Sequence, residues 1–75
     1  MSNNNNLMKD MRLSRGMTVK EFADSIGISS TTVSNVENNV RALTAEMRAS
    51  ILRIHEMDEA FFFYIEQKKK ADSYK

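Results

Sequence analysis

Small hydrogen-bonding side chains are concentrated in one short stretch of this sequence, at Ser30, Thr31, Ser34 and Asn35. Their hydroxyl and amide groups can donate and accept hydrogen bonds, but none is a strong acid, a strong base or a charged group. If the stretch is helical, Ser30, Thr31 and Asn35 lie on its outer face with Ser34 at the edge, and Val33 and Val36 face inward. Such a face could recognise another polar surface by hydrogen bonding. The alternative is an ordinary solvated helix face.

Catalytic chemistry has little support in the rest of the chain. His55 is the only histidine, and the acidic residues around it do not have the spacing of metal ligands. The chain has no cysteine, so neither a disulfide nor a thiolate metal site can form. No nucleophile lies in a pattern that pairs it with a base. We therefore expect no enzyme activity, no cofactor and no metal, and we interpret His55 as a surface residue or a helix cap.

Local signals indicate the two helices that would position the polar stretch. Thr18 and Glu21 have the spacing of a capping box, in which the two side chains satisfy amides at a helix start. Gly27 supplies the left-handed residue at which a helix can stop, and Ser29 is a good N-cap for the next helix. Two helices joined by so short a connection form a helix-turn-helix, a unit that can place its second helix in the major groove of DNA.

Length and composition restrict the classes of protein that remain. The chain has 75 residues, no proline and a net charge of +1, which suits one small helical domain. This charge alone does not indicate nucleic acid, because a dedicated polycation has a large excess of Lys and Arg. The longest apolar run, residues 60–65, is far shorter than the roughly 20 residues that span a membrane. The asparagine-rich start lacks the features of a signal peptide, so we expect a cytoplasmic protein with no membrane contact.

The expected organisation has three parts: a disordered N-terminal arm at residues 1–6, a single all-α domain at residues 7–70 and a frayed tail at residues 71–75. The domain should contain five helices, at residues 7–15, 19–25, 30–38, 45–55 and 59–69, the last two capped by Thr44 and Asp58. Apolar residues at helical spacing predict a core of Met8, Met11, Met17, Phe22, Ala23, Ile26, Val33, Val36, Ile51 and Ile54.

The stretch from Ile28 to Asn38 reads ISSTTVSNVEN. It matches V-S-x-x-T-I-S-x-I-E-N, a pattern found in one family of helix-turn-helix proteins. With upstream matches such as Phe22-Ala23 and Ile26-Gly27, the chain resembles the Cro/C1-type (Xre-like) helix-turn-helix regulators of phages and bacteria over about residues 7–43. The resemblance implies a compact five-helix, lambda-repressor-like DNA-binding domain, with the helix-turn-helix at its second and third helices. The chain departs from the family at Val19, where Gln is usual, and at Asn39, where Gly is usual.

Under this resemblance, double-stranded DNA is the partner and the third helix contacts base edges. The candidate base contacts are Ser30, Thr31 and Asn35, with Ser34 as a weaker one. Asn can pair bidentately with adenine, and Ser or Thr can donate, accept or approach a thymine methyl group. A solvated polar face remains the alternative for all of them.

The candidate phosphate contacts are Thr18, Lys20, Asn38, Asn39 and Arg41. The amides of residues 18–20 would lie at a helix N-terminus, which favours an anion. Ordinary surface charge is the alternative for Lys20 and Arg41. In the family, the positions of Arg12 and Glu37 form an ion pair, so we assign these two residues a structural role without base contact.

Phe61, Phe62, Phe63 and Tyr64 are four consecutive aromatic residues. Because helical residues are rotated by roughly 100° from one to the next, these side chains point in nearly all directions around a helix. One small core cannot bury all of them, which predicts a homodimer surface or a surface for a protein partner. The alternative is a folded-back helix with two Phe buried. The run of residues 68–70, all Lys, is interpreted as a solvated helix end.

Two hypotheses of function follow. The first is a sequence-specific DNA-binding transcriptional regulator, a repressor of the phage or mobile-element kind that occupies an operator through its third helix. The second is a protein-interaction module that binds another regulator through the aromatic fifth helix. The absence of Lys and Arg between Ile28 and Asn39 keeps the second hypothesis open.

Overall fold

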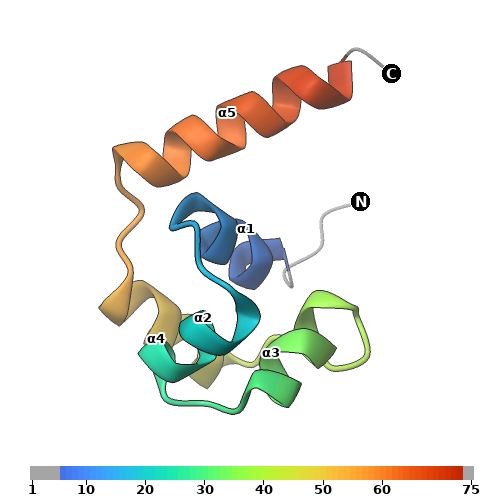
Figure 1. Ribbon diagram of the computed structural model, residues 1–75, viewed down its shortest axis with the longest axis vertical. Helices are drawn as coiled ribbons and strands as arrows, with labels where there is room; N and C mark the ends of the chain where they lie inside the picture. The colour runs from blue at the N-terminus through green and yellow to red at the C-terminus, as the bar shows by residue number, and fades with distance from the viewer. Residues whose placement is uncertain (1–5, 74–75) are drawn as a thin grey trace.

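Five α-helices and no strand make up the part of the chain that the computed structural model describes, residues 6–73 (Figure 1). In chain order they are α1 (Asn6–Ser14), α2 (Val19–Ile26), α3 (Ser30–Glu37), α4 (Ala45–Ile54) and α5 (Glu59–Ser73). The predicted all-α, five-helix fold is therefore confirmed. The predicted arm at residues 1–6 lies outside the described residues, except for Asn6, which begins α1.

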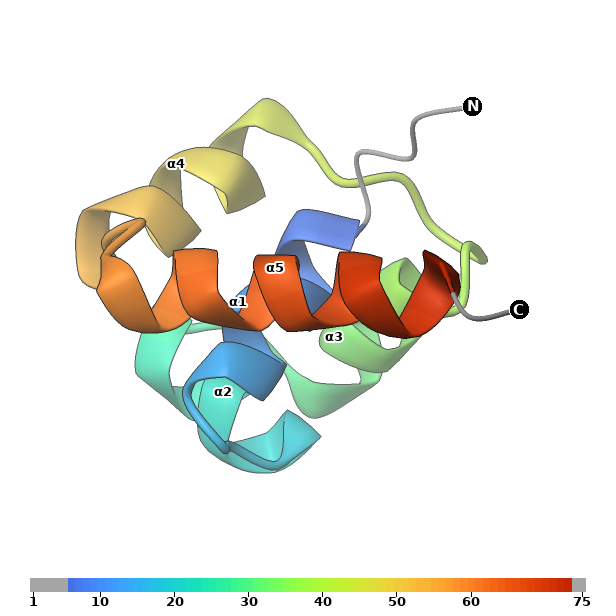
Figure 2. The ribbon, with the colours of Figure 1, turned by 90° about the horizontal axis from the view of Figure 1, so that it is seen from above.

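Helix α1 lies in the middle of the molecule. Helix α5 crosses one side of it, as both views show (Figures 1 and 2), and α3 and α4 contact it on the other side. Helix α2 contacts α3 and α4. The helix-turn-helix of α2 and α3 therefore lies on the opposite side of α1 from α5.

Side-chain hydrogen bonds between residues three positions apart cap the starts of α2, α4 and α5. Thr18 Oγ1 accepts the Glu21 N–H at 3.1 Å, and Glu21 Oε1 accepts the Thr18 N–H at 2.9 Å, so the predicted capping box is confirmed. The hydroxyl of Thr44 and the carboxylate of Asp58 accept amide hydrogens three residues further along at 3.1 Å, which confirms the caps of α4 and α5. These bonds satisfy backbone donors that would otherwise lack a partner at a helix start.

A left-handed residue forms the turn between α2 and α3. Gly27 has φ +77°, and its N–H bonds to the Ala23 carbonyl, so α2 ends there as predicted. Ser29 then caps α3 by accepting the Thr32 N–H at 3.1 Å. After α3, Asn39 adopts φ +63°, a conformation that asparagine tolerates better than most residues. The chain thus turns sharply at both ends of α3.

The buried core contains every predicted core residue except Met17 and Ile54. Met17 is half-buried against the core, and Ile54 is 48% exposed, so the prediction for Ile54 is wrong. The reason is that α4 ends at Ile54, and the ring of the following residue, His55, stacks on Phe22 in the place that Ile54 was expected to fill. Met47 and Phe61 are buried in addition to the predicted residues.

Polar contacts hold α5 against α1 and the residue after it at two places, at the start of α5 and again at Lys68. At the start of α5, Arg15 donates to Asp58 Oδ1 at 3.0 Å and to the Glu56 carbonyl at 2.6 Å. The bond from the Phe61 amide, followed by the bond from Arg15, lowers the pKa of Asp58. Further along, Lys68 Nζ lies 3.1 Å from Asp10 Oδ1, whose side chain is largely buried.

Two predictions for the C-terminal region are corrected by this geometry. Helix α5 continues to Ser73, beyond the predicted end of the fifth helix at residue 69, and residues 74–75 lie outside the described part of the chain. Lys68 is an ion-pair partner of α1 rather than part of a freely solvated helix end. Within the described residues, no helix has the length and apolar character needed to cross a membrane.

Candidate nucleic-acid interface

An open depression of about 430 Å³ lies between the start of α2 and the outer side of α3. It is lined by Val19, Lys20, Ser30, Thr31, Ser34 and Asn35. The structure thus brings all four predicted base contacts together with Lys20, a predicted phosphate contact. Ser30 and Thr31 are exposed, and Ser34 and Asn35 are half-buried. Val19 is the lining residue that the sequence did not identify as a contact.

The loop after α3 carries three of the predicted phosphate contacts, Asn38, Asn39 and Arg41, and its backbone is hydrogen-bonded to α3. The Asn35 carbonyl accepts the N–H groups of Val40 at 2.8 Å and Arg41 at 3.2 Å. Asn39 and Arg41 are both exposed on this loop. Because the bonds involve backbone atoms, they fix the loop beside α3 without using the Asn35 side chain.

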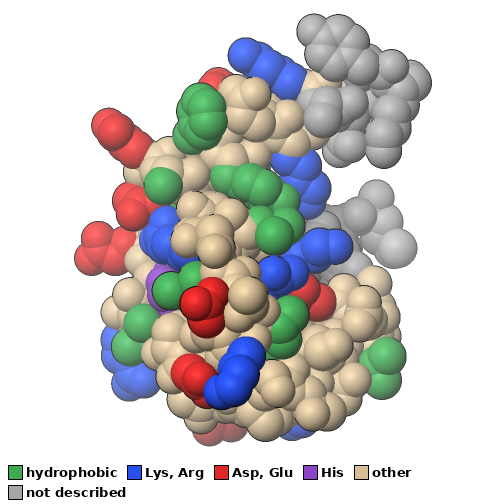
Figure 3. All heavy atoms as spheres, viewed as in Figure 1, with side chains coloured by type: hydrophobic (Ala, Val, Ile, Leu, Met, Phe, Trp, Pro, Cys, Tyr) green, Lys and Arg blue, Asp and Glu red, His purple; other side chains and the backbone are tan. Residues whose placement is uncertain are grey.

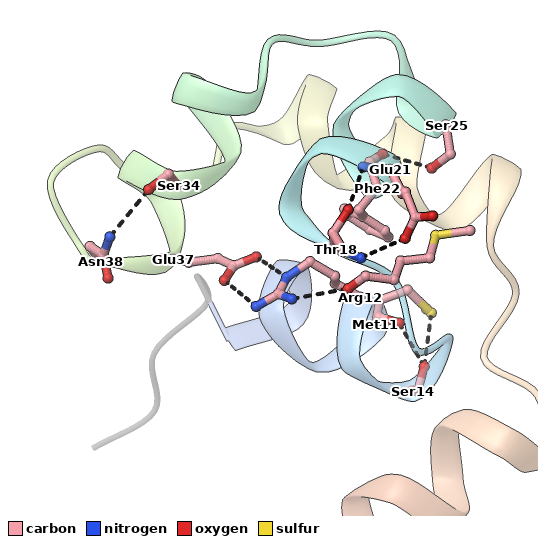
Figure 4. Close-up of polar contacts among 11 residues, drawn as sticks. Met11, Arg12, Ser14, Thr18, Glu21, Phe22, Ser25, Ser34, Glu37 and Asn38 are labelled. Atoms are coloured by element: carbon pink, nitrogen blue, oxygen red, sulfur yellow. Dashed lines mark hydrogen bonds and ion pairs between the residues drawn. The ribbon is translucent and has the colours of Figure 1, made fainter.

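The side chains of Asn38 and Lys20, both predicted phosphate contacts, have partners within the chain. The Asn38 side-chain amide donates to Ser34 Oγ at 3.4 Å (Figure 4), which fits the edge position of Ser34. Lys20 Nζ lies 3.2 Å from Asp24 Oδ2, and both side chains are exposed. An exposed pair of this kind is weak, so it would not prevent Lys20 from turning to a phosphate.

The capping box changes which atoms at the start of α2 can bind a phosphate. The Thr18 N–H donates to Glu21 and the Thr18 hydroxyl oxygen accepts from Glu21 (Figure 4), so Thr18 can offer a phosphate its hydroxyl hydrogen but not its backbone amide. The next amides, those of Val19 and Lys20, are at positions with no intrahelical acceptor. These two amides are better candidates than the Thr18 amide for binding an anion at this helix terminus.

Arg12 and Glu37 form the ion pair that the resemblance implies, and it joins α1 to the end of α3. Arg12 Nε and Nη2 donate to the two Glu37 oxygens at 2.7 and 2.9 Å, and Nη1 donates to the Met17 carbonyl at 3.0 Å (Figure 4). The bond to Glu37 raises the pKa of Arg12 above its ordinary value. The guanidinium therefore connects the last turn of α3 to the backbone just before α2, which sets the relative position of the two helices.

His55 has a structural environment. It caps the end of α4, and its ring is buried and stacked on Phe22, with 5.0 Å between ring centroids and 22° between planes. Its Nε2 lies 2.8 Å from Ser25 Oγ. Burial, and secondarily the charge of Arg15, lowers the pKa of His55 below its ordinary value. The residue is the predicted helix cap, but it lies in the interior and not on the surface. Among the described residues, no cluster of His, Cys, Asp and Glu could hold a metal ion.

The aromatic run on α5 divides between the core and the surface. Phe61 is 6% exposed, so its assignment to a dimer or partner surface is wrong, because it packs into the core. Phe62 and Phe63 are 57% and 64% exposed, and Tyr64 is half-buried. Hydrophobic side chains are visible over α5 in the space-filling view (Figure 3). Phe62 and Phe63 line an open depression of about 660 Å³ with Glu59, Ala60 and Glu66.

Helices α2 and α3, their caps and the short left-handed turn between them form a helix-turn-helix, with a polar depression beside α3. A family model described as helix-turn-helix matches residues 8–56, and the chain belongs to this family of Cro/C1-type regulators. The match covers α2 and α3 and stops before α5. Comparisons with curated proteins and with solved structures gave no match.

Proposed function

We propose that this chain is a sequence-specific transcriptional repressor of the phage or mobile-element kind. It occupies an operator with α3 in the major groove, it has no catalytic step, and it acts in the cytoplasm, where such operators lie. The observation that carries the proposal is the depression that gathers Ser30, Thr31 and Asn35 beside Lys20. Base-edge donors and acceptors would face hydrogen-bonding side chains there, and a phosphate would face a cation and a helix N-terminus.

The contacts divide into two groups. Ser30, Thr31 and Asn35, with Ser34 at the edge, contact base edges and supply sequence preference. Phosphates are contacted by Thr18, Lys20, Asn38, Asn39 and Arg41, which fix the register of the protein on the duplex. At Thr18 the contact is made by the hydroxyl hydrogen, because the capping box already uses the backbone N–H.

Titration with labelled DNA fragments from around the gene of this protein tests the proposal. We expect one fragment to bind more tightly than a shuffled duplex of the same composition at two salt concentrations. Both duplexes offer the same phosphates, so raising the salt should weaken both affinities while the preference for that fragment persists. Equal affinity for all fragments at both salt concentrations would contradict sequence-specific binding.

We further propose a homodimer through α5, because operators of paired half-sites require twofold symmetry. The exposed pair Phe62 and Phe63 supports this surface. Each subunit would then present one α3 to one half-site.

The protein-interaction hypothesis remains the second candidate, and a specific observation favours it. Helix α3 carries no Lys or Arg, while α5 exposes two Phe side chains. Under this hypothesis α5 binds another regulator and α3 touches DNA weakly. Chemical-shift mapping with added DNA separates the two: shifts confined to residues 30–35 and the adjoining loop favour the repressor, and shifts confined to α5 favour the interaction module.

A further inference from the structure

Val19 is the only hydrophobic residue among the described residues that line the depression between α2 and α3. Every other lining side chain can form hydrogen bonds, whereas valine can neither donate nor accept one. At this position the related regulators usually have Gln, which does both. The recognition surface of this chain therefore contains one apolar point where a polar group is usual.

The backbone around Val19 holds this apolar point in place. Val19 is the first residue of α2, directly after the cap Thr18, whose two bonds to Glu21 measure 3.1 and 2.9 Å. The side chain is half-buried: part of it packs against the core, and part lines the depression. A β-branched side chain in a helix has one strongly preferred χ1 rotamer. Its methyl groups are thus positioned before any DNA arrives.

The chemistry of the major groove leaves few partners for such a group. Base edges present nitrogen and oxygen atoms there, and the apolar exception is the C5-methyl group of thymine. A valine pressed against a polar base edge would deprive that edge of water without giving it a hydrogen bond, which is unfavourable. Against a methyl group, the same valine removes apolar surface from water on both sides.

We propose that Val19 is a specificity-determining residue that contacts the C5-methyl group of a thymine at the contacted base pair nearest the start of α2. The inference rests on the proposed function, because it needs α3 in the major groove. It adds a preference that Ser30, Thr31 and Asn35 do not supply by hydrogen bonding. If Val19 instead lay against a deoxyribose, affinity would not depend on any base methyl group.

The test removes the methyl group and nothing else. An operator is first selected with the wild-type chain from a pool of randomised duplexes, and each thymine in it is then replaced singly by deoxyuridine. At one position we expect the wild-type affinity to fall about fourfold, the factor that corresponds to one buried methyl group. The same replacement should leave the affinity of Val19→Ala unchanged. At this position, 5-methylcytosine should bind wild type more tightly than cytosine does.

Matched variants and a stability measurement keep the result interpretable. Val19→Ile retains an apolar β-branched side chain and should retain the methyl effect. Val19→Thr replaces one methyl group by a hydroxyl at nearly constant shape and should diminish the effect, which provides a second variant if Val19→Ala melts early. Thermal unfolding of each variant checks that the fold persists.

The outcomes separate this inference from the function on which it rests. A selected operator whose affinity is insensitive to every deoxyuridine replacement would overturn the role of Val19 and leave the repressor proposal intact. So would a methyl effect of equal size in wild type and Val19→Ala. A pool that yields no preferred sequence would overturn the proposed function, and the role of Val19 with it.

Discussion

Arg12 influences the candidate interface although it lies outside the depression. Its guanidinium makes two bonds to Glu37 and one to the Met17 carbonyl, and so it holds the end of α3 and the start of α2 in a fixed relation. A lysine could not reproduce this planar, forked set of donors. A partly buried ion pair adds little net stability compared with apolar residues of the same size. Its contribution is therefore the orientation of α3.

Asn35 is the residue for which we expect the clearest effect on sequence preference. Asn35→Ala removes the side-chain amide but keeps the backbone carbonyl that binds the N–H groups of Val40 and Arg41. Specific binding should weaken by about 1–3 kcal/mol, the value of one bidentate base contact, with non-specific binding nearly unchanged. Fluorescence anisotropy with operator and shuffled duplexes measures both affinities.

Arg41→Ala is the matched control for that substitution. The loss of a phosphate contact should weaken specific and non-specific binding alike and reduce the log-log salt slope by about one unit. If Asn35→Ala behaved in the same way as Arg41→Ala, the assignment of Asn35 to a base edge would be wrong.

His55 should make stability depend on pH below neutrality. Its pKa in the folded chain is below the ordinary value of 6.5, because the ring is buried and, secondarily, because of the positive charge of Arg15. Well above pH 6.5 the ring is neutral in both folded and unfolded chains, so it contributes no pH dependence there. As the pH falls, the unfolded chain binds the proton first, and the free energy of unfolding decreases until the pH passes below the folded pKa.

Urea unfolding at pH 7.5 and 5.5, about one unit on either side of the ordinary pKa of histidine, measures this effect. We expect the wild type to lose more stability between these two values than His55→Gln, which cannot titrate but can still bond to Ser25. Equal losses in the two proteins would show that other groups cause the dependence.

At the scale of elements, Phe61 is the aromatic side chain that α5 buries in the core, where Ile65 and two ion pairs also hold the helix. Phe61 is buried, while Phe63, two residues further along, is mostly exposed. Phe61→Ala should therefore cost about 3–5 kcal/mol, a large part of the stability of a small domain. Phe63→Ala, the matched control on the same helix, should change it by less than about 0.5 kcal/mol. Chemical unfolding of the two variants measures the difference, and similar costs would mean that the burial of α5 is misassigned.

The helix starts were predictable because their determinants are local. Thr18, Thr44 and Asp58 each accept an amide only three residues away, so the sequence contains both partners of each bond. The left-handed turn at Gly27 and the inward positions of Val33 and Val36 follow from equally short spacing. These features also determine where α3 begins and which of its faces is outward.

The errors arise where tertiary packing decides. Ile54 continues an apolar stripe, yet it is exposed because the ring of His55 fills the space against Phe22. Lys68 pairs with Asp10 across 58 positions, and no local pattern links the two. Which of four consecutive aromatics is buried depends on the rotation of α5 about its axis, and this rotation is set by α1.

The polar face of the candidate site was predictable because, like the start of α3, it depends on local spacing. The prediction was incomplete because the rest of the site, like the burial of α5, depends on tertiary packing. Ser30, Thr31 and Asn35 share a face by periodicity, and the structure places them in one depression. Val19 completes that depression from a different helix. Its sequence signal was only the departure from the usual Gln, and the contact with α3 depends on how the two helices pack.

At the scale of the whole molecule, the charge limits what one copy can do on DNA. The chain has 11 Lys and Arg residues against 10 Asp and Glu residues. Two cations, Lys20 and Arg41, are assigned here to phosphates. Each neutralised phosphate contributes about −0.9 to the log-log salt slope, so a monomer should bind weakly at physiological salt. Two linked copies would engage two half-sites about one helical turn apart and gain by effective concentration.

The exposed aromatic pair on α5 is where we expect that link, so Phe63→Ser and Phe62→Ser should weaken operator binding while leaving α1 to α4 folded. Phe63 is largely exposed, so Phe63→Ser removes no core packing and the melting temperature should stay near that of the wild type. Phe62→Ser also removes an edge-to-face contact with the buried ring of Phe61, at 5.7 Å between ring centroids, so Phe63→Ser is the cleaner variant. The salt slope on the full operator should also fall toward that of a single half-site. Sedimentation at tens of micromolar, with and without operator DNA, measures the assembly directly. A wild-type chain that is strictly monomeric in both states would rule out the dimer and leave the α5 surface to a different protein.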